Sequence, residues 1–137
     1  MIDVASPKVF EAFVEVCESE RLARRAISWG RNPTVFVAKF VNDNGYEQAT
    51  PPGMYKGHCT WRERNIVNLN RHWAIGYEEF RDNWIHVERI VLHELIHWAR
   101  FMGGKPGHAN GTREAGNFFE EKAYGGILGD HDDLPCS

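Results

Sequence analysis

Residues 91–104 read VLHELIHWARFMGG and belong to the longest helical pattern in the chain. This stretch holds two histidines four residues apart, His93 and His97, with Glu94 beside the first. Apolar residues fill most of the other positions, and Gly103–Gly104 supplies a helix stop. A helical pattern that is apolar nearly all round except for one polar stripe predicts a buried helix whose polar side meets something other than hydrocarbon.

The spacing of the two histidines predicts a metal site. On a helix His93 and His97 lie about 40° apart around the axis, with Cβ atoms about 6 Å apart, so both imidazoles can bind one zinc ion. Glu94 lies on the flank of that face, where its carboxylate can hydrogen-bond a water held by the metal. We therefore predict His93 and His97 as ligands and Glu94 as general base. The same polar stripe carries His86, Arg89 and Arg100.

A third ligand must come from elsewhere, because catalytic zinc takes three protein ligands and keeps a fourth position for water. The metzincin pattern would place glycine and histidine three and six residues after His97, but Arg100 and Gly103 stand there, which excludes that class. The later candidates lie in a glycine-rich loop, a helical segment and a polar tail: His108, Glu114, Glu120, Glu121, Asp130, His131 and Asp132.

Packed elements hold ligands more rigidly than a loop or a terminal tail, which favours the helical pattern NFFEEKAYGG at 117–126. Within that pattern Glu120 lies beside the face of Phe119 and Ala123 that should pack inward, whereas Glu121 faces nearly away from it. We predict Glu120 as the third ligand. Glu121 stays the alternative, because a helix rotated to turn Glu121 inward is also compatible with the pattern.

The rest of the chain has the patterns of a mixed helix and strand protein. Proline in a first turn, β-branched runs and helical spacing of apolar residues mark the elements. They predict a helix over 7–28, strands over 34–41 and 65–70, a helical region over 77–102 with a break near Asp82–Asn83, and a glycine-rich loop over 104–116.

The composition limits the class of protein. The chain has 137 residues, the size of one ordinary domain, with 42% apolar and 26% charged residues, which is a globular composition. The formal net charge of −3 and pI of 6.1 provide no basic field for phosphates, so we expect no nucleic-acid partner. We also expect no membrane span and no signal peptide, because no long apolar run is present and the N-terminus lacks a basic start followed by an apolar run.

Tryptophans and cysteines carry no site in this interpretation. In a domain of this size we assign packing to Trp61, Trp73, Trp84 and Trp98. We expect cysteine chemistry to be incidental, because three scattered cysteines without a C-x-x-C pair are too few for a disulfide framework: Cys17, Cys59 and Cys136.

The motifs carry a resemblance to a known family. HELIHW at 93–98, followed by FEEKAYG at 119–125, resembles zincin metallopeptidases with a glutamate third ligand. It is most similar to the small zincin-like metallopeptidase toxin domains of bacterial polymorphic toxins and secreted effectors. In related zincins the pattern E-x-x-A-[DY] supplies the ligand from its first glutamate, which matches Glu120, Ala123 and Tyr124. The specific motifs lie within residues 86–127, and the first 85 residues match only in general layout.

The resemblance implies a fold, a cofactor and an activity. We expect residues 1–137 to form a single α+β zincin-like domain, with a small mixed or antiparallel sheet packed on helices that include the H-E-x-x-H helix. It implies Zn2+ and peptide-bond hydrolysis in a target cell. We further expect a protein or peptide substrate, a cognate immunity protein, a monomeric chain, and secretion or delivery as part of a larger carrier that holds the delivery signal.

Peptide hydrolysis also needs a group that stabilises the developing negative charge of the tetrahedral intermediate. Tyr124 is the first candidate, with packing in the core as its competing interpretation, and His108, Arg113 and His86 follow in that order. The strand NIVNLN at 65–70 would pair an extended substrate if it has an exposed edge, or is an ordinary sheet strand.

Two other classes of protein fit the same residues. The first is a non-catalytic, zinc-stabilised interaction domain with the same ligands, in which replacement of Glu94 would leave function intact. The second is an interaction protein without metal whose core helix happens to hold histidines, which a metal assay would exclude.

Overall fold

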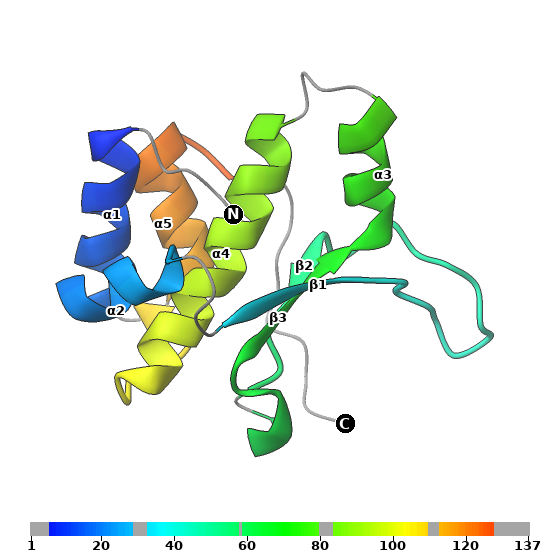
Figure 1. Ribbon diagram of the computed structural model, residues 1–137, viewed down its shortest axis with the longest axis horizontal. Helices are drawn as coiled ribbons and strands as arrows, with labels where there is room; N and C mark the ends of the chain where they lie inside the picture. Colours follow the sequence, from blue (N-terminus) through cyan, green and yellow to red (C-terminus); the bar gives the residue numbers. More distant parts are fainter. Residues whose placement is uncertain (1–5, 29–32, 58, 80–83, 110–112, 128–137) are drawn as a thin grey trace.

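Helix α4 (Trp84–Met102) carries the H-E-x-x-H stretch and lies between two groups of elements in the computed structural model (Figure 1). The structure describes residues 6–28, 33–57, 59–79, 84–109 and 113–127. Helices α1 (Pro7–Cys17) and α5 (Ala115–Tyr124) pack on one side of α4, and a small sheet packs on the other. The expected α+β class, with a small sheet on helices, is confirmed.

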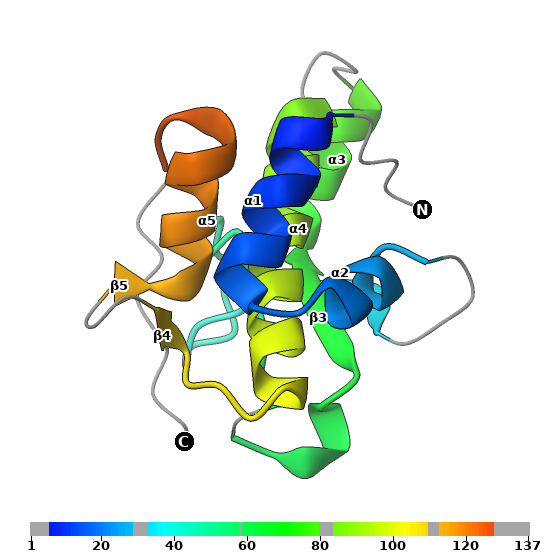
Figure 2. The same cartoon turned by 90° about the vertical axis from the view of Figure 1, so that its left-hand side faces the viewer.

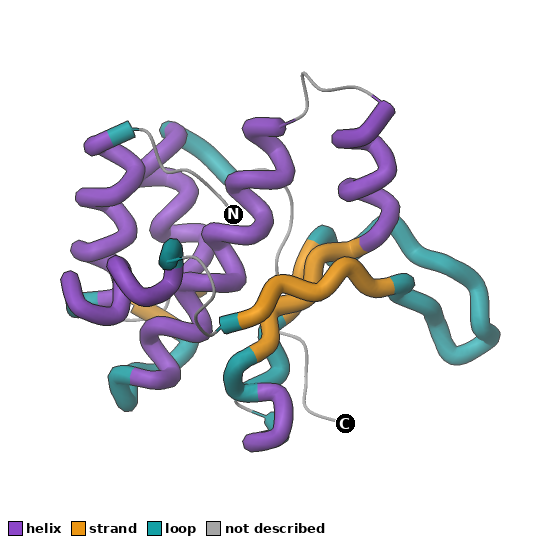
Figure 3. The backbone as a smooth tube through the Cα atoms, viewed as in Figure 1, coloured by secondary structure: helices purple, strands orange, loops and turns teal. Residues whose placement is uncertain are grey.

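The sheet is mixed and has three strands in the order β1-β3-β2. Strand β1 (Thr34–Ala38) pairs in parallel with β3 (Ile66–Asn70), and β2 (Gly53–Met54) pairs antiparallel with the other side of β3. The loop between β1 and β2 extends away from the helices (Figure 3). The predicted strand at 65–70 is therefore central, and the suggestion that it offers an edge to substrate is wrong, because both of its edges are paired.

The expected helix over 7–28 is two helices, α1 and α2 (Glu20–Ala26). Glu18 ends α1 with a positive φ of 61°, the left-handed conformation typical of helix ends. Ser19 then caps α2, because its side chain accepts a hydrogen bond from the backbone nitrogen of Leu22. The chain thus turns sharply where the sequence pattern predicted continuity.

The segment before α5 also differs from the expected loop. Strands β4 (His108–Ala109) and β5 (Arg113–Glu114) pair antiparallel as a hairpin at one end of α5 (Figure 2). Helix α5 begins at Ala115, two residues before the predicted helical pattern. Glu114 is the N-cap of α5, and its carboxylate accepts from the backbone nitrogen of Gly116. The break expected near Asp82–Asn83 lies outside the described residues, between α3 (Arg71–Glu79) and α4.

The core forms around α4. Leu92, Ile96 and Trp98 are fully buried, and burial of each such side chain contributes about 1.5–3 kcal/mol relative to exposure. Phe13 of α1 meets Phe119 of α5 edge to face, with ring centroids 5.6 Å apart. These contacts hold α1, α4 and α5 together and fix the surroundings of the two histidines.

Several expectations about side chains are corrected by the structure. Trp98 is buried as expected, but Trp61, in the 3-10 helix Trp61–Glu63, is 63% exposed, so the packing role assigned to it is wrong. Trp73 is partly buried and donates its indole N–H to the carbonyl of Ala49.

Cys59 is disulfide-bonded, so cysteine chemistry is not incidental there. No helix among the described residues has the length and apolar character that a membrane crossing requires.

Candidate metal centre

Helix α4 brings His93, Glu94 and His97 together as the spacing predicts. A ligand atom from each lies within 4.8 Å of the others, and the two imidazole centroids are 5.3 Å apart. His93 and Glu94 are buried, and the side chain of His97 is 13% exposed. The site is therefore nearly enclosed by protein, with His97 on its more open side.

Glu114 contacts the Nε2 nitrogen of both histidines. Its Oε2 lies 2.8 Å from Nε2 of His93, and its Oε1 lies 2.7 Å from Nε2 of His97. The carboxylate is 9% exposed and comes from the end of β5, where α5 begins. One carboxylate thus bridges the two Nε2 nitrogens. Two imidazoles and one carboxylate are the donor set of many catalytic zinc sites with three protein ligands.

The predicted ligand Glu120 approaches His93 from the other side of the ring. Its Oε2 lies 2.7 Å from Nδ1 of His93, and its Oε1 lies 3.3 Å from the guanidinium of Arg89. Because Nδ1 and Nε2 of one imidazole point in different directions, Glu120 is not placed where the two Nε2 atoms converge. The alternative, Glu121, is half-exposed and forms an ion pair with Arg113.

The carboxylates determine the electrostatics of the cluster. Burial by itself lowers the pKa of His93, but Glu94, Glu114 and Glu120 outweigh burial and raise the pKa to about 10. Burial raises the pKa of Glu114, yet its hydrogen bonds with His93 and His97 hold that pKa far below the usual range. For Glu94 burial dominates and raises the pKa. Three acidic side chains around two imidazoles make a site that favours positive charge, as a cation requires.

Tyr124, the first candidate for stabilising the tetrahedral intermediate, uses its hydroxyl elsewhere. The hydroxyl donates to Oε1 of Glu88 at 2.7 Å, and the guanidinium carbon of Arg89 lies 4.8 Å from the centre of its ring. Burial and the neighbouring Glu88 raise the pKa of Tyr124. This packing between α4 and α5 matches the competing interpretation of Tyr124 as a core aromatic.

The remaining candidates for that role have other surroundings. His108 lies on β4 with an exposed side chain, and Arg113 pairs with Glu121. The ring of His86 stacks on Trp73 with centroids 6.4 Å apart. These placements do not identify the group that stabilises the intermediate.

Two glycines touch the site and were missed by sequence reasoning. A Cβ on Gly116 would overlap the imidazole of His93, and a Cβ on Gly53 would lie 2.9 Å from Cγ of Glu94. Gly116 stands in the first turn of α5, and Gly53 stands on β2. The only signals in the sequence are a glycine two residues after Glu114 in REAGN and a glycine after two prolines in PPGM, and neither predicts the contact.

Arg100, one helical turn beyond His97, fastens the hairpin to α4. It is 3% exposed and donates to the carbonyls of Val16, Pro106 and His108 at 2.7, 2.9 and 3.0 Å. His108 pairs with Glu114 across the hairpin, so Arg100 helps to set where Glu114 reaches the histidines.

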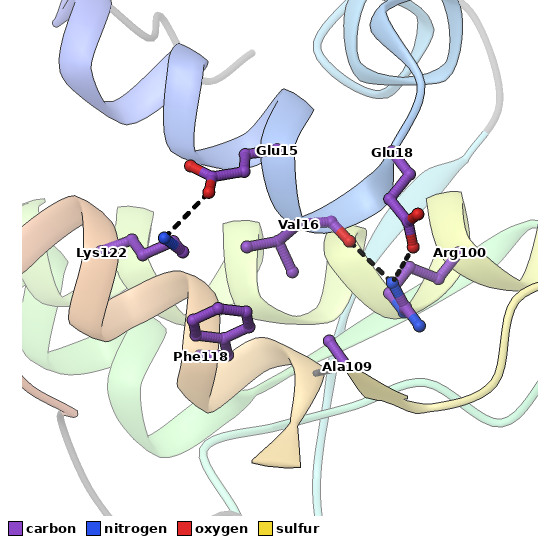
Figure 4. A pocket seen from close by; sticks show the side chains of 7 residues that line it. All are labelled: Glu15, Val16, Glu18, Arg100, Ala109, Phe118 and Lys122. Atoms are coloured by element: carbon purple, nitrogen blue, oxygen red, sulfur yellow. Dashed lines mark hydrogen bonds and ion pairs between the residues drawn. The ribbon is translucent and has the colours of Figure 1, made fainter. Parts of the chain in front are cut away.

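Arg100 also lines an open cleft of about 420 Å³, with its contacts to Val16 and Glu18 drawn in Figure 4. The seven lining residues come from α1, α5, the α1–α2 turn, β4 and Arg100 of α4, and do not include His93, Glu94 or His97. This cleft is therefore separate from the histidines.

Comparison with known proteins supplies the family. A family model described as metallopeptidase toxin 3 matches residues 3–125, which is nearly the whole chain. The matched residues include the H-E-x-x-H stretch, Glu114 and Glu120. No curated protein and no solved structure matches. The match agrees with the geometry of α4 and confirms the resemblance to metallopeptidase toxin domains. The chain belongs to the metallopeptidase toxin 3 family.

Proposed function

We propose that this chain is a zinc-dependent peptidase in which His93, His97 and Glu114 hold the metal and Glu94 is the general base. One observation carries the proposal: the carboxylate of Glu114 lies 2.8 Å from Nε2 of His93 and 2.7 Å from Nε2 of His97, and both histidines are on the buried helix α4. We prefer Glu114 to Glu120 as third ligand, because only Glu114 faces both Nε2 atoms.

The chemistry of the donors supports zinc. Two neutral imidazoles and one carboxylate suit this ion, and the family is one of metallopeptidases. Zinc, when bound, would acidify a water and polarise the scissile carbonyl. The protein contributes ligands from two packed elements, α4 and the junction of β5 with α5, so little reorganisation is needed to bind the ion.

Glu94 is placed to move the proton. Its Oε2 lies 4.0 Å from Nε2 of His93, which is one of the proposed ligand atoms. The backbone of Gly53 lies close behind the side chain of Glu94. In this position the carboxylate takes a proton from the attacking water and delivers it to the leaving amine. The buried surroundings keep bulk water from competing for the same hydrogen bonds.

Strand β2 provides a path for the substrate. It is an edge strand of the three-stranded sheet, and its Gly53 touches Glu94. An extended peptide that added to this edge would pass directly beside the general base. We propose this arrangement in place of the pairing suggested for the strand at 65–70.

The family also supports the biological setting. A metallopeptidase toxin acts on protein, and on that ground we propose delivery into a target cell as part of a larger secreted carrier and protection of the producer by a cognate immunity protein. The proposed ligands and Glu94 all come from one chain, so the site needs no residue from a second copy, and we propose a monomer.

Metal analysis combined with a cleavage assay tests the function. Wild type should bind one zinc ion per chain and degrade a protein substrate, and a His93→Ala/His97→Ala variant should do neither. Glu94→Gln should retain zinc and lose cleavage. A non-catalytic zinc domain is the better description if Glu94→Gln retains the full activity of wild type.

A further inference from the structure

We propose that Glu120, held in place by Arg89, orients the imidazole of His93 for the metal. Glu120 is thus a positioning residue and not a ligand. The inference rests on the proposed function, because it takes His93 as a metal ligand through Nε2. It changes the role of a residue whose motif resembles that of a ligand.

The contact between Glu120 and His93 is fully enclosed. Both residues are 1% exposed, and Oε2 of Glu120 lies 2.7 Å from Nδ1 of His93, between helices α5 and α4. A histidine that binds a metal through Nε2 keeps its proton on Nδ1. A carboxylate that accepts a hydrogen bond from this Nδ1–H fixes the tautomer and the plane of the ring. It also makes Nε2 more basic and therefore a stronger ligand for the metal.

Arg89 holds the second oxygen of the same carboxylate. Its Nε and Nη2 both lie 3.3 Å from Oε1 of Glu120, and Nη2 also donates to the carbonyl of Gly126 at 2.5 Å. The guanidinium compensates the negative charge of Glu120 in the core and prevents the carboxylate from rotating. The contact with Gly126 ties the end of α5 to α4 at the same point.

These contacts commit both oxygens of Glu120 away from the metal side of His93. Oε1 of Glu120 faces Arg89, and Oε2 faces Nδ1 of His93. On the opposite side of the ring, Nε2 of His93 contacts Glu114 and lies close to Gly116. The His93 ring is thereby fixed from two directions. A purely structural ion pair between α4 and α5 would stabilise the fold in the same way, but it would not change the affinity of the site for zinc.

Zinc affinity of the whole chain, measured by competition with a chromogenic chelator, separates the two roles. Glu120→Gln keeps the size of the side chain and an acceptor oxygen but removes the charge. We expect it to weaken zinc binding by about 10- to 100-fold while one ion per chain is still bound. Glu121→Gln is the matched control on the adjacent, half-exposed glutamate, and it should leave the affinity unchanged.

A second variant tests the same role if Glu120→Gln does not fold. Arg89→Gln removes the group that holds Glu120 from a less buried position, 16% exposed, and should weaken zinc binding in the same direction. Two-dimensional 15N spectra of the zinc-loaded proteins should also show the Nδ1–H resonance of His93 shifted in both variants and unshifted in Glu121→Gln. These readouts do not depend on peptidase activity.

The outcomes are distinguishable. Unchanged zinc affinity in folded Glu120→Gln or Arg89→Gln would overturn the positioning role and leave the proposed peptidase intact. Loss of the bound ion in Glu120→Gln, with normal binding in Glu114→Gln, would make Glu120 the ligand and overturn this inference as well. Failure of wild type to bind zinc would instead overturn the proposed function on which the inference rests.

Discussion

Oε2 of Glu114 lies 2.8 Å from Nε2 of His93, so the end of a short hairpin meets the centre of a buried helix. The same carboxylate reaches Nε2 of His97 at 2.7 Å. The site is therefore assembled from two elements, and its geometry depends on how the β4–β5 hairpin and the start of α5 are held against α4.

Gly116→Ala tests the contact that leaves room for the His93 ring. The added Cβ would overlap the imidazole, and forcing extra atoms into a packed core costs about 1–3 kcal/mol. We expect weaker zinc binding and a lower melting temperature, although alanine is the better helix former. Gly126→Ala is the control, because a Cβ there meets nothing within 4 Å. Equal zinc affinity in the two variants would contradict the crowding argument.

Gly53→Ala tests the placement of the general base separately from the metal. Its Cβ would lie 2.9 Å from Cγ of Glu94 and from Cγ2 of Ile90, so the glutamate must shift. Misplacement of a reacting group by about 1 Å can cost up to about 100-fold in rate. We expect kcat to fall by that order while zinc content measured by mass spectrometry stays at the wild-type level. Wild-type kcat would contradict the placement of Glu94 as the general base.

Arg100→Met tests the anchor of the hairpin. The substitution leaves the carbonyls of Val16, Pro106 and His108 without their donor. The bond to Val16 is buried, and a buried acceptor without a partner costs about 1–3 kcal/mol. We expect the free energy of unfolding in urea to fall by about 1–3 kcal/mol. Arg24→Met removes an exposed i,i+4 ion pair and should change it by less than about 0.5 kcal/mol. Similar losses in the two variants would rule out the anchoring role.

Cys17 gives a dependence on pH that does not involve the metal. Burial raises the pKa of its thiol above the usual value of 9.0, so the folded protein keeps its proton where the unfolded chain releases it. Stability from this residue is therefore present below pH 9.0 and is lost as the pH rises through that value toward the folded pKa. Cys17→Ala should reduce the fall in unfolding free energy above pH 9.0. An identical pH profile in the variant would exclude this effect.

The sequence predicted those parts of the site that depend on one helix. The relative positions of His93, Glu94 and His97 follow from helical periodicity alone, and α4 reproduces them. Glu114 is one of the candidates in the sequence, but the helical pattern of 117–126 favours Glu120. The position of Glu114 depends on the register of the hairpin and on the first residue of α5, and neither is set by local spacing.

The same distinction applies to the fold. The strand at 65–70 was predicted from its residues, but its central place between β1 and β2 depends on long-range pairing. The turn between α1 and α2 had a local signal in Ser19, a favoured N-cap residue, which the longer apolar pattern obscured. Exposure of Trp61 had no such signal, because tryptophan is mostly buried in small domains.

A crystal structure of the zinc-loaded protein, with diffraction recorded at the zinc absorption edge, would identify the atoms that bind the ion. We expect one ion bound by Nε2 of His93, Nε2 of His97 and a carboxylate oxygen of Glu114 at about 2.0–2.2 Å, with Glu120 still on Nδ1 of His93. An ion bound by Glu120 in place of Glu114, or no ion between the two histidines, would contradict the account.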